Sequence, residues 1–144
     1  MKISGLVVTL NEEKNIGKCI DALLKVCDEV IIVDSFSKDR TVAIAKEKGA
    51  TVIEQSYLGD GPQRTFGLPY CKYDWILNLD ADEFLDKDAE QFILNKKYLE
   101  GNYDAFSFRV KNFLADKLID FSGWYPDHKV RFFNKKTAHP SDSK

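Results

Sequence analysis

Short apolar runs alternate with helical patterns in the first half of the chain, and this alternation limits its fold more than any other feature. Four runs have the length and composition of buried strands, and they span residues 3–10, 29–34, 51–54 and 74–80. After the first run, apolar residues fall at i, i+3, i+4, i+7 and i+8 between Ile16 and Leu24, which predicts a helix with one buried face. Such an order is typical of parallel strands joined by right-handed crossovers. Because the runs are almost entirely apolar, helices should cover both faces of the sheet.

The remaining elements follow from capping residues and from a change of pattern in the last third. Asn11 and Asp39 can cap the first and second helices, and Gly49 can end the second one. Two more helices are expected over residues 63–68 and 86–98, and residues 105–110 and 129–133 alternate like antiparallel or mixed strands. We therefore expect an α/β fold: one domain with an open, mostly parallel, nucleotide-binding sheet flanked by helices, and mixed or antiparallel strands in the C-terminal third.

Composition excludes several classes of protein. The 144 residues carry 21 basic and 23 acidic side chains, a balance that argues against a protein that coats nucleic acid. No apolar run approaches the ~20 residues that span a membrane, and the N-terminus lacks the layout of a signal peptide. Three cysteines without a C-x-x-C spacing favour free thiols in a reducing cytoplasm over disulfides or a zinc site.

Three of the predicted strands end in polar or acidic side chains. They are Thr9, Asn11 and Glu12 at the end of the first strand, Asp34 and Ser35 at the end of the second, and Asp80 and Asp82 at the end of the fourth. The carboxyl ends of parallel strands meet at one edge of a sheet, which is where ligands bind in open α/β folds. We expect these side chains to form a substrate site at that edge.

Asp80 and Asp82 are the candidate metal ligands of this site. Two carboxylates held close on a stiff turn repel each other, and a divalent cation relieves that repulsion. Oxygen ligands suit Mg²⁺ or Mn²⁺, which would then bridge diphosphate oxygens. The spacing alone is weak evidence, because Asp86-x-Asp88 repeats it at an expected helix start, and both pairs of acids can simply cap helices and face water.

Three other side chains have both a functional and a structural interpretation. Asp34 can accept hydrogen bonds from a nucleobase imide or a ribose hydroxyl, or form an Asx-turn with Ser35 or Ser37. Glu12 lies in the first turn of a helix, where acids complement the helix dipole. Arg64, at a loop-to-helix junction, can bind phosphate oxygens with two parallel bonds or remain solvated.

Three motifs, in this order and spacing, resemble those of the family 2 glycosyltransferases, which are inverting enzymes with the GT-A fold. The motifs are residues 7–12 (VVTLNE), 33–41 (VDSFSKDRT) and 75–83 (WILNLDADE). A later stretch, residues 122–133, resembles a branch that adds glucose to the inner core of lipopolysaccharide. The resemblance implies that Glu12 and Asp34 hold the nucleoside of a nucleotide sugar and that Arg64 lies near its diphosphate. It also implies that Asp80 touches ribose or metal and that Asp82 binds the metal directly.

The resemblance further implies which part of the chain binds the donor, which part binds the acceptor, and what these partners are. Residues 1–83 would bind the nucleotide-sugar donor, with a UDP-sugar expected, and residues 84–144 would form part of the acceptor side. The acceptor would be a glycan or a lipid-linked molecule, with peripheral contact at the inner face of the membrane. The family's catalytic base is an Asp or Glu that follows the strand corresponding to residues 131–133. Asp127 precedes that strand and matches poorly, so we expect the base beyond Lys144 in a longer parent chain.

Two alternatives from other classes remain open. A metal-dependent nucleotidyltransferase also places acids beside a nucleotide, although its usual glycine-rich basic loop near the N-terminus is missing here. The chain could also be a nucleotide-binding fragment without turnover. A phosphatase of the haloacid dehalogenase type is disfavoured, because Phe84 stands where its D-x-D-x-[TV] motif has Thr or Val. The sugar, the nucleobase, the acceptor and the oligomeric state cannot be read from these motifs.

Overall fold

The computed structural model describes residues 2–108, 110–112 and 130–137, and its core is a six-stranded sheet. In spatial order the strands are β3 (Thr51–Glu54), β2 (Glu29–Asp34), β1 (Ile3–Thr9), β4 (Trp75–Asp80), β8 (Phe132–Asn134) and β6 (Ala105–Phe106). The first four are parallel, whereas β8 runs antiparallel to β4 and to β6. The predicted α/β class, with a mostly parallel sheet and antiparallel strands late in the chain, is confirmed.

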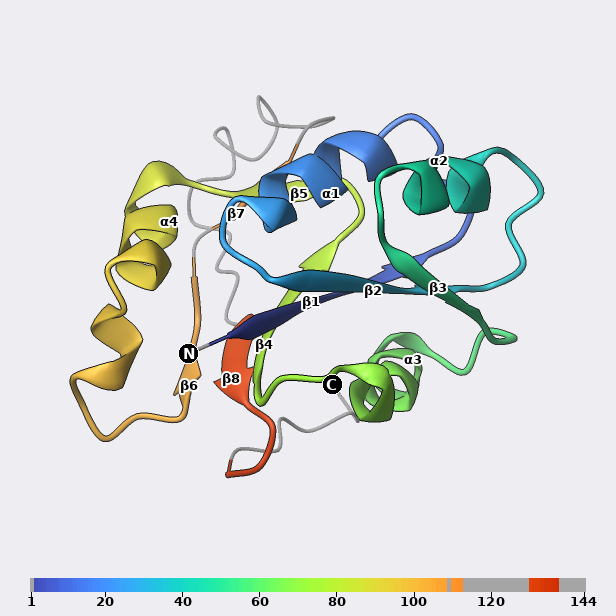
Figure 1. The fold of residues 1–144 in the computed structure, drawn as a ribbon. Helices are drawn as coiled ribbons and strands as arrows, with labels where there is room; N and C mark the ends of the chain where they lie inside the picture. The colour runs from blue at the N-terminus through green and yellow to red at the C-terminus, as the bar shows by residue number, and fades with distance from the viewer. Residues whose placement is uncertain (1, 109, 113–129, 138–144) are drawn as a thin grey trace, which may run out of the picture.

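Helices cover both faces of the sheet (Figure 1). The elements are α1 (Ile16–Leu24), α2 (Thr41–Glu47), α3 (Asp60–Gly67) and α4 (Lys87–Leu94), with the short 3₁₀ helices η1 (Leu68–Tyr70) and η2 (Lys97–Leu99). α1 and α2 lie on one face and α3 on the other. Alternate residues of the central strands divide between the two cores: Val7 packs on the α1 side and Leu6 on the α3 side. This two-sided burial explains why the strands read as continuous apolar runs.

Helix α3 lies unusually close to the sheet at Gly67. A Cβ atom at this position would come within 2.7 Å of methyl carbons of Leu6 and Val33. Real Cβ atoms do not approach other heavy atoms so closely, so the contact requires a residue without a side chain. Since Arg64 precedes Gly67 by about one helical turn, this close approach also sets the height of Arg64 above the sheet edge.

Two expectations for the second half of the chain were wrong in detail. The predicted helix over residues 86–98 ends at Leu94, because Lys96 adopts a left-handed conformation (φ 56°) that an α-helix cannot continue. The predicted strand over residues 105–110 is divided into β6 and β7 (Val110–Asn112). β7 pairs with β5 (Glu83–Leu85) in a separate two-stranded antiparallel sheet, and β5 is too short to show a periodicity in the sequence.

The cysteines and the helix lengths bear on two further expectations. Cys19, Cys27 and Cys71 are free, as the sequence predicted, and all three are buried. Among the residues that the structure describes, none of the helices has the length and apolar character needed to cross a bilayer.

Candidate functional site

The register of the parallel strands brings the polar strand ends to one edge of the sheet. Thr9 at the end of β1 lies opposite Asp34 at the end of β2, and Val8 lies opposite Asp80 at the end of β4. Residues separated by 25 to 72 positions in the sequence therefore become neighbours in space. The expected convergence at the carboxyl edge is present.

A pocket of about 390 Å³ opens at this edge. It is lined by Val8, Thr9, Leu10, Glu12, Ser35, Tyr57, Arg64, Asp80, Ala81 and Asp82. Six of the eight candidate residues from the sequence thus line a single cavity, and of the described residues Asn11 and Asp34 are the two candidates that do not. Arg64 comes from α3, whereas the acids come from the strand ends, so the pocket combines a cation with several carboxylates.

Asp34 does not line the pocket, but it contacts Thr9, which does, and its side chain is fully buried. Its Oδ1 accepts hydrogen bonds from Thr9 Oγ1 at 2.7 Å and Ser37 Oγ at 2.6 Å, and its Oδ2 accepts one from the Ser37 amide at 2.7 Å. These contacts are those of the Asx-turn with Ser37 that the sequence left open. Contact with a nucleoside stays a prediction for Asp34, whose carboxylate here orders the ends of β1 and β2.

Asn11 joins the loop after β1 to the loop after β2. The backbone N–H of Asn11 donates to Ser37 Oγ at 2.7 Å, and its side-chain Oδ1 accepts from the backbone N–H of Lys38 at 2.8 Å. The backbone of Asn11 lies in the left-handed region (φ 55°). The expectation that Asn11 caps the first helix was wrong, because α1 begins only at Ile16 and Asn15 occupies the N-cap position. Asn11 instead fixes the shape of the pocket rim.

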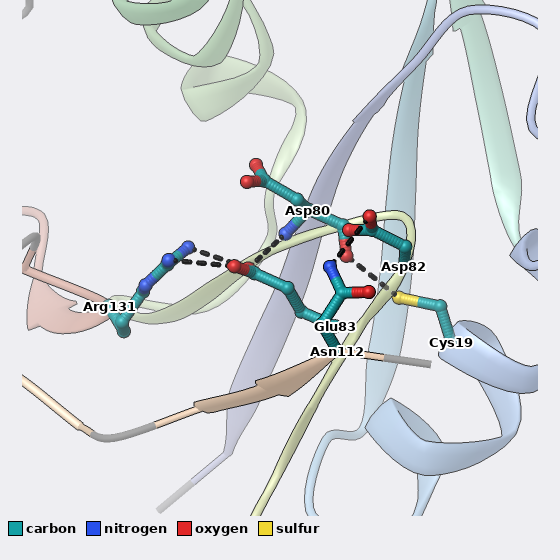
Figure 2. A network of polar contacts seen from close by, with 6 residues as sticks. All are labelled: Cys19, Asp80, Asp82, Glu83, Asn112 and Arg131. Carbon is teal, nitrogen blue, oxygen red and sulfur yellow. Dashed lines mark hydrogen bonds and ion pairs between the residues drawn. The ribbon is translucent and has the colours of Figure 1, made fainter. Parts of the chain in front are cut away.

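Asp80 and Asp82 lie on a tight turn that residues from the last third of the chain hold in place (Figure 2). The Asp80 amide donates to Glu83 Oε1 at 2.8 Å, and Asn112 Nδ2 donates to Asp82 Oδ2 at 2.7 Å. Glu83 is in turn paired with Arg131. Local sequence patterns missed Asn112 and Arg131, because these partners are 30 and 48 residues away from the acids they contact. One signal was available: an arginine inside the apolar run 130–133 needs a buried carboxylate.

The acids of the pocket influence one another's ionisation. Burial raises the pKa of Glu12, and the negative charges of Asp82, Asp80 and Asp39 raise this pKa further, against a hydrogen bond from Asn15 that lowers it. The pocket therefore holds a surplus of negative charge that a bound cation would relieve.

The donor atoms present fit Mg²⁺ or Mn²⁺. Within the described part of the chain, no group of three or more His, Cys, Asp or Glu side chains could enclose a metal ion. Two carboxylates, Asp80 and Asp82, line the pocket instead. Such a pair is characteristic of Mg²⁺, which is usually bound by one or two carboxylates together with phosphate oxygens and water.

Arg64 and Ser35 are each held by a buried amide side chain. With the Asn78 amide oriented to suit both neighbours, its oxygen accepts from Arg64 Nε at 3.2 Å and its nitrogen donates to the Leu6 carbonyl at 3.1 Å. Gln63, fully buried, donates from Nε2 to Ser35 Oγ at 3.1 Å and accepts at Oε1 from the Leu58 amide at 2.8 Å. These amides have no distinctive sequence pattern, and sequence reasoning missed both.

Some candidates lie outside the described residues. They are Asp127, the weak candidate for the catalytic base, and most of the stretch 122–133 that carried the second resemblance. Their roles stay predictions.

Comparisons with a family model and with two individual proteins match this chain to glycosyltransferases. A family model described as "Glycosyl transferase family 2" matches residues 4–140. A Rickettsia felis protein described as an uncharacterized glycosyltransferase is 47% identical over 140 residues, which cover 95% of this chain and 49% of that protein. The lipopolysaccharide core biosynthesis glycosyltransferase LpsC of Rhizobium meliloti is 36% identical over 98 residues, covering 65% of this chain and 36% of LpsC.

A solved structure resembles the fold over a smaller region. Glucosyl-3-phosphoglycerate synthase from Mycobacterium tuberculosis, in complex with Mn²⁺, UDP and glucosyl-3-phosphoglycerate, matches with a TM-score of 0.52 and 28% identity. The match covers 58% of this chain and 34% of that one. The chain spans about half the length of the Rickettsia relative it matches.

Proposed function

The chain belongs to glycosyl transferase family 2, and from that premise we propose that the protein transfers a sugar from a nucleotide-sugar donor, with inversion, to a glycan or lipid-linked acceptor. The observation that carries the proposal is the pocket at the carboxyl edge, where Arg64 faces the same space as Glu12, Asp80 and Asp82. A cation beside paired carboxylates suits a metal-bound diphosphate, because each charged group of the ligand finds an opposite charge.

The donor is a UDP-sugar in this proposal. The pocket of about 390 Å³ offers Ser35, Thr9 and Tyr57 on the side of β1 and β2, which would receive the nucleoside, and Arg64 for the diphosphate. Asp34 would act indirectly, by fixing Thr9 and the loop at Ser37. The Mycobacterium tuberculosis relative, whose complex contains UDP and Mn²⁺, supports this choice of ligand.

Asp80 and Asp82 would hold a divalent metal ion, Mg²⁺ or Mn²⁺. When bound, the metal supplies positive charge that stabilises the departing nucleoside diphosphate. Arg64 in the same pocket would add a positive charge, and the tight turn at residues 80–83 would hold the carboxylates without reorganisation during the reaction. Inversion would result from a single in-line displacement, in which the acceptor oxygen attacks the anomeric carbon as a base removes its proton.

The acceptor and the location follow from the relatives. The similarity to LpsC supports an acceptor of the lipopolysaccharide core type. A lipid-linked acceptor of this kind would place the protein in the cytoplasm at the inner face of the membrane.

Calorimetric titration of UDP into the protein, in Mn²⁺ and in EDTA, tests the proposal. We expect affinity in Mn²⁺ to exceed that in EDTA by at least roughly tenfold, a difference of about 1.4 kcal/mol. Asp82→Asn should abolish the gain. Asp88→Asn, an exposed acid of the second D-x-D pair in the first turn of α4, should keep it. Equal affinities of the wild-type protein in Mn²⁺ and EDTA would contradict the proposed metal site.

A further inference from the structure

A buried ion pair lies directly behind the turn that carries Asp80 and Asp82. Arg131, the residue before β8, places Nη1 at 2.8 Å from Glu83 Oε1 and Nη2 at 2.9 Å from Oε2. The exposed fractions of the two side chains are 2% for Arg131 and 11% for Glu83. Nη2 donates a hydrogen bond to Oε2 and Nη1 adds an ion-pair contact with Oε1, so two guanidinium nitrogens hold the carboxylate.

The same carboxylate also fixes the backbone of the turn. Glu83 Oε1, which contacts Arg131, accepts the hydrogen bond from the Asp80 amide at 2.8 Å. The backbone of Arg131 is held by a separate contact: its carbonyl oxygen accepts a hydrogen bond of 2.7 Å from the backbone N–H of Asn78 in β4. The contacts therefore form a chain from the β4–β8 ladder through Arg131 and Glu83 to the amide of Asp80 (Figure 2).

Charge gives the pair a second effect. Glu83 on its own would add a third negative charge next to Asp80 and Asp82. The guanidinium of Arg131 compensates that charge, so that, among the described residues of the turn, the two carboxylates of Asp80 and Asp82 remain to match one divalent cation.

Stability alone is a weak reason for this arrangement. Removing two charges from water is costly, and an apolar pair of similar volume commonly stabilises a fold as well as a buried ion pair does. The pair differs from an apolar pair in two ways: the Glu83 carboxylate accepts a hydrogen bond from the Asp80 backbone amide, and the Arg131 guanidinium compensates the charge of that carboxylate.

We propose that Arg131 is a positioning residue for the metal site: acting through Glu83, it holds the Asp80–Asp82 turn in the geometry and charge that bind a divalent cation. Asn112 assists by holding Asp82 Oδ2 from β7. This inference rests on the proposed function of Asp80 and Asp82.

The test separates metal binding from folding and from nucleotide binding. Glu83→Gln combined with Arg131→Met removes both charges at once, which avoids leaving one charge buried alone. For this double variant we expect a melting temperature close to wild type and an unchanged affinity for UDP in EDTA. Its affinity for Mn²⁺ in the presence of UDP, followed by electron paramagnetic resonance of free Mn²⁺, should fall roughly 10–100-fold.

A matched control comes from an exposed ion pair. Arg40 Nη2 lies 3.6 Å from Glu47 Oε2, and both side chains are about two-thirds exposed. The double variant Arg40→Met with Glu47→Gln should therefore leave the Mn²⁺ affinity unchanged. Arg131→Lys keeps the charge but loses the two-pronged contact. Lower Mn²⁺ affinity at an unchanged melting temperature in this variant supports the inference, and a lower melting temperature at unchanged Mn²⁺ affinity overturns it.

The outcomes distinguish the two proposals. A double variant that folds and binds Mn²⁺ as tightly as wild type would show that the pair is only structural. A wild-type protein whose UDP affinity ignores Mn²⁺ would overturn the proposed function itself, and this inference with it.

Discussion

Thr9 Oγ1 donates a hydrogen bond of 2.7 Å to Asp34 Oδ1, and this contact joins the ends of β1 and β2. Both side chains are buried, and Ser37 completes the set of donors around the carboxylate. A buried carboxyl group that accepts three hydrogen bonds from within the protein therefore lies next to a residue that lines the pocket.

Asp34→Asn should lower the free energy of unfolding by about 1–3 kcal/mol, because the amide nitrogen takes the place of one acceptor oxygen and at least one hydrogen bond from Thr9 or Ser37 can no longer be accepted there. Urea denaturation measures the change. Glu54→Gln is the matched control, since Glu54 pairs with Asp34 in register but its side chain is exposed. Weaker UDP binding at unchanged stability would instead indicate that Asp34 contacts the nucleotide.

Gly67→Ala should destabilise the protein by about 1–3 kcal/mol, although alanine favours helices, because the new methyl group would meet Leu6 and Val33 at 2.7 Å. Gly17→Ala in α1 provides the comparison. Its Cβ would meet neighbouring atoms at 3.5 Å, an ordinary contact, so this variant should be neutral or more stable by up to about 1 kcal/mol. Similar melting temperatures for the two variants would disprove the close approach of α3.

Glu12→Gln should stabilise the metal-free protein at pH 7. Burial and the charges of Asp82 and Asp80 raise the pKa of Glu12 in the folded state, so folding favours the protonated form. The associated stability is present at low pH and is lost as pH rises through the raised pKa. The gain from the amide should therefore be seen at pH 7 and disappear below about pH 4, where glutamate is also protonated in the unfolded chain.

Urea denaturation in EDTA at the two pH values measures this effect. In Mn²⁺ the gain should shrink or reverse, because a bound cation stabilises the ionised carboxylate. A variant equally stabilised at pH 4 and pH 7 would show that the ionisation of Glu12 is not the cause.

The family and the fold class could be predicted because their determinants are local. Each parallel strand is a contiguous apolar run, and each motif residue lies at or just after the end of its strand. The sequence alone therefore predicts a parallel sheet with the acids at its carboxyl edge. The comparisons confirm both predictions. The start of α4 at Asp86, whose side chain accepts from the Ala89 amide at 2.8 Å, was equally local.

The supports of the site could not be predicted in the same way. Arg131, Asn112 and Gln63 act through contacts with residues 28 to 48 positions away, and no short pattern specifies which distant partner a buried polar side chain will find. The short strand β5 was missed for a related reason, since its three residues are ordered by pairing with β7 and not by their own periodicity.

The position of β8 beside β4 has a consequence for any attempt to isolate residues 1–83. Trp75 on β4 stacks on Phe132 of β8 with ring centroids 4.9 Å apart, and Ile76 and Leu77 pair with the same strand. A fragment that stopped at residue 83 would leave β4 as a bare apolar border with unpaired amides, which invites association with other copies. We expect such a fragment to aggregate, so the solubility of the parallel part of the sheet depends on the β8 strand at residues 132–134.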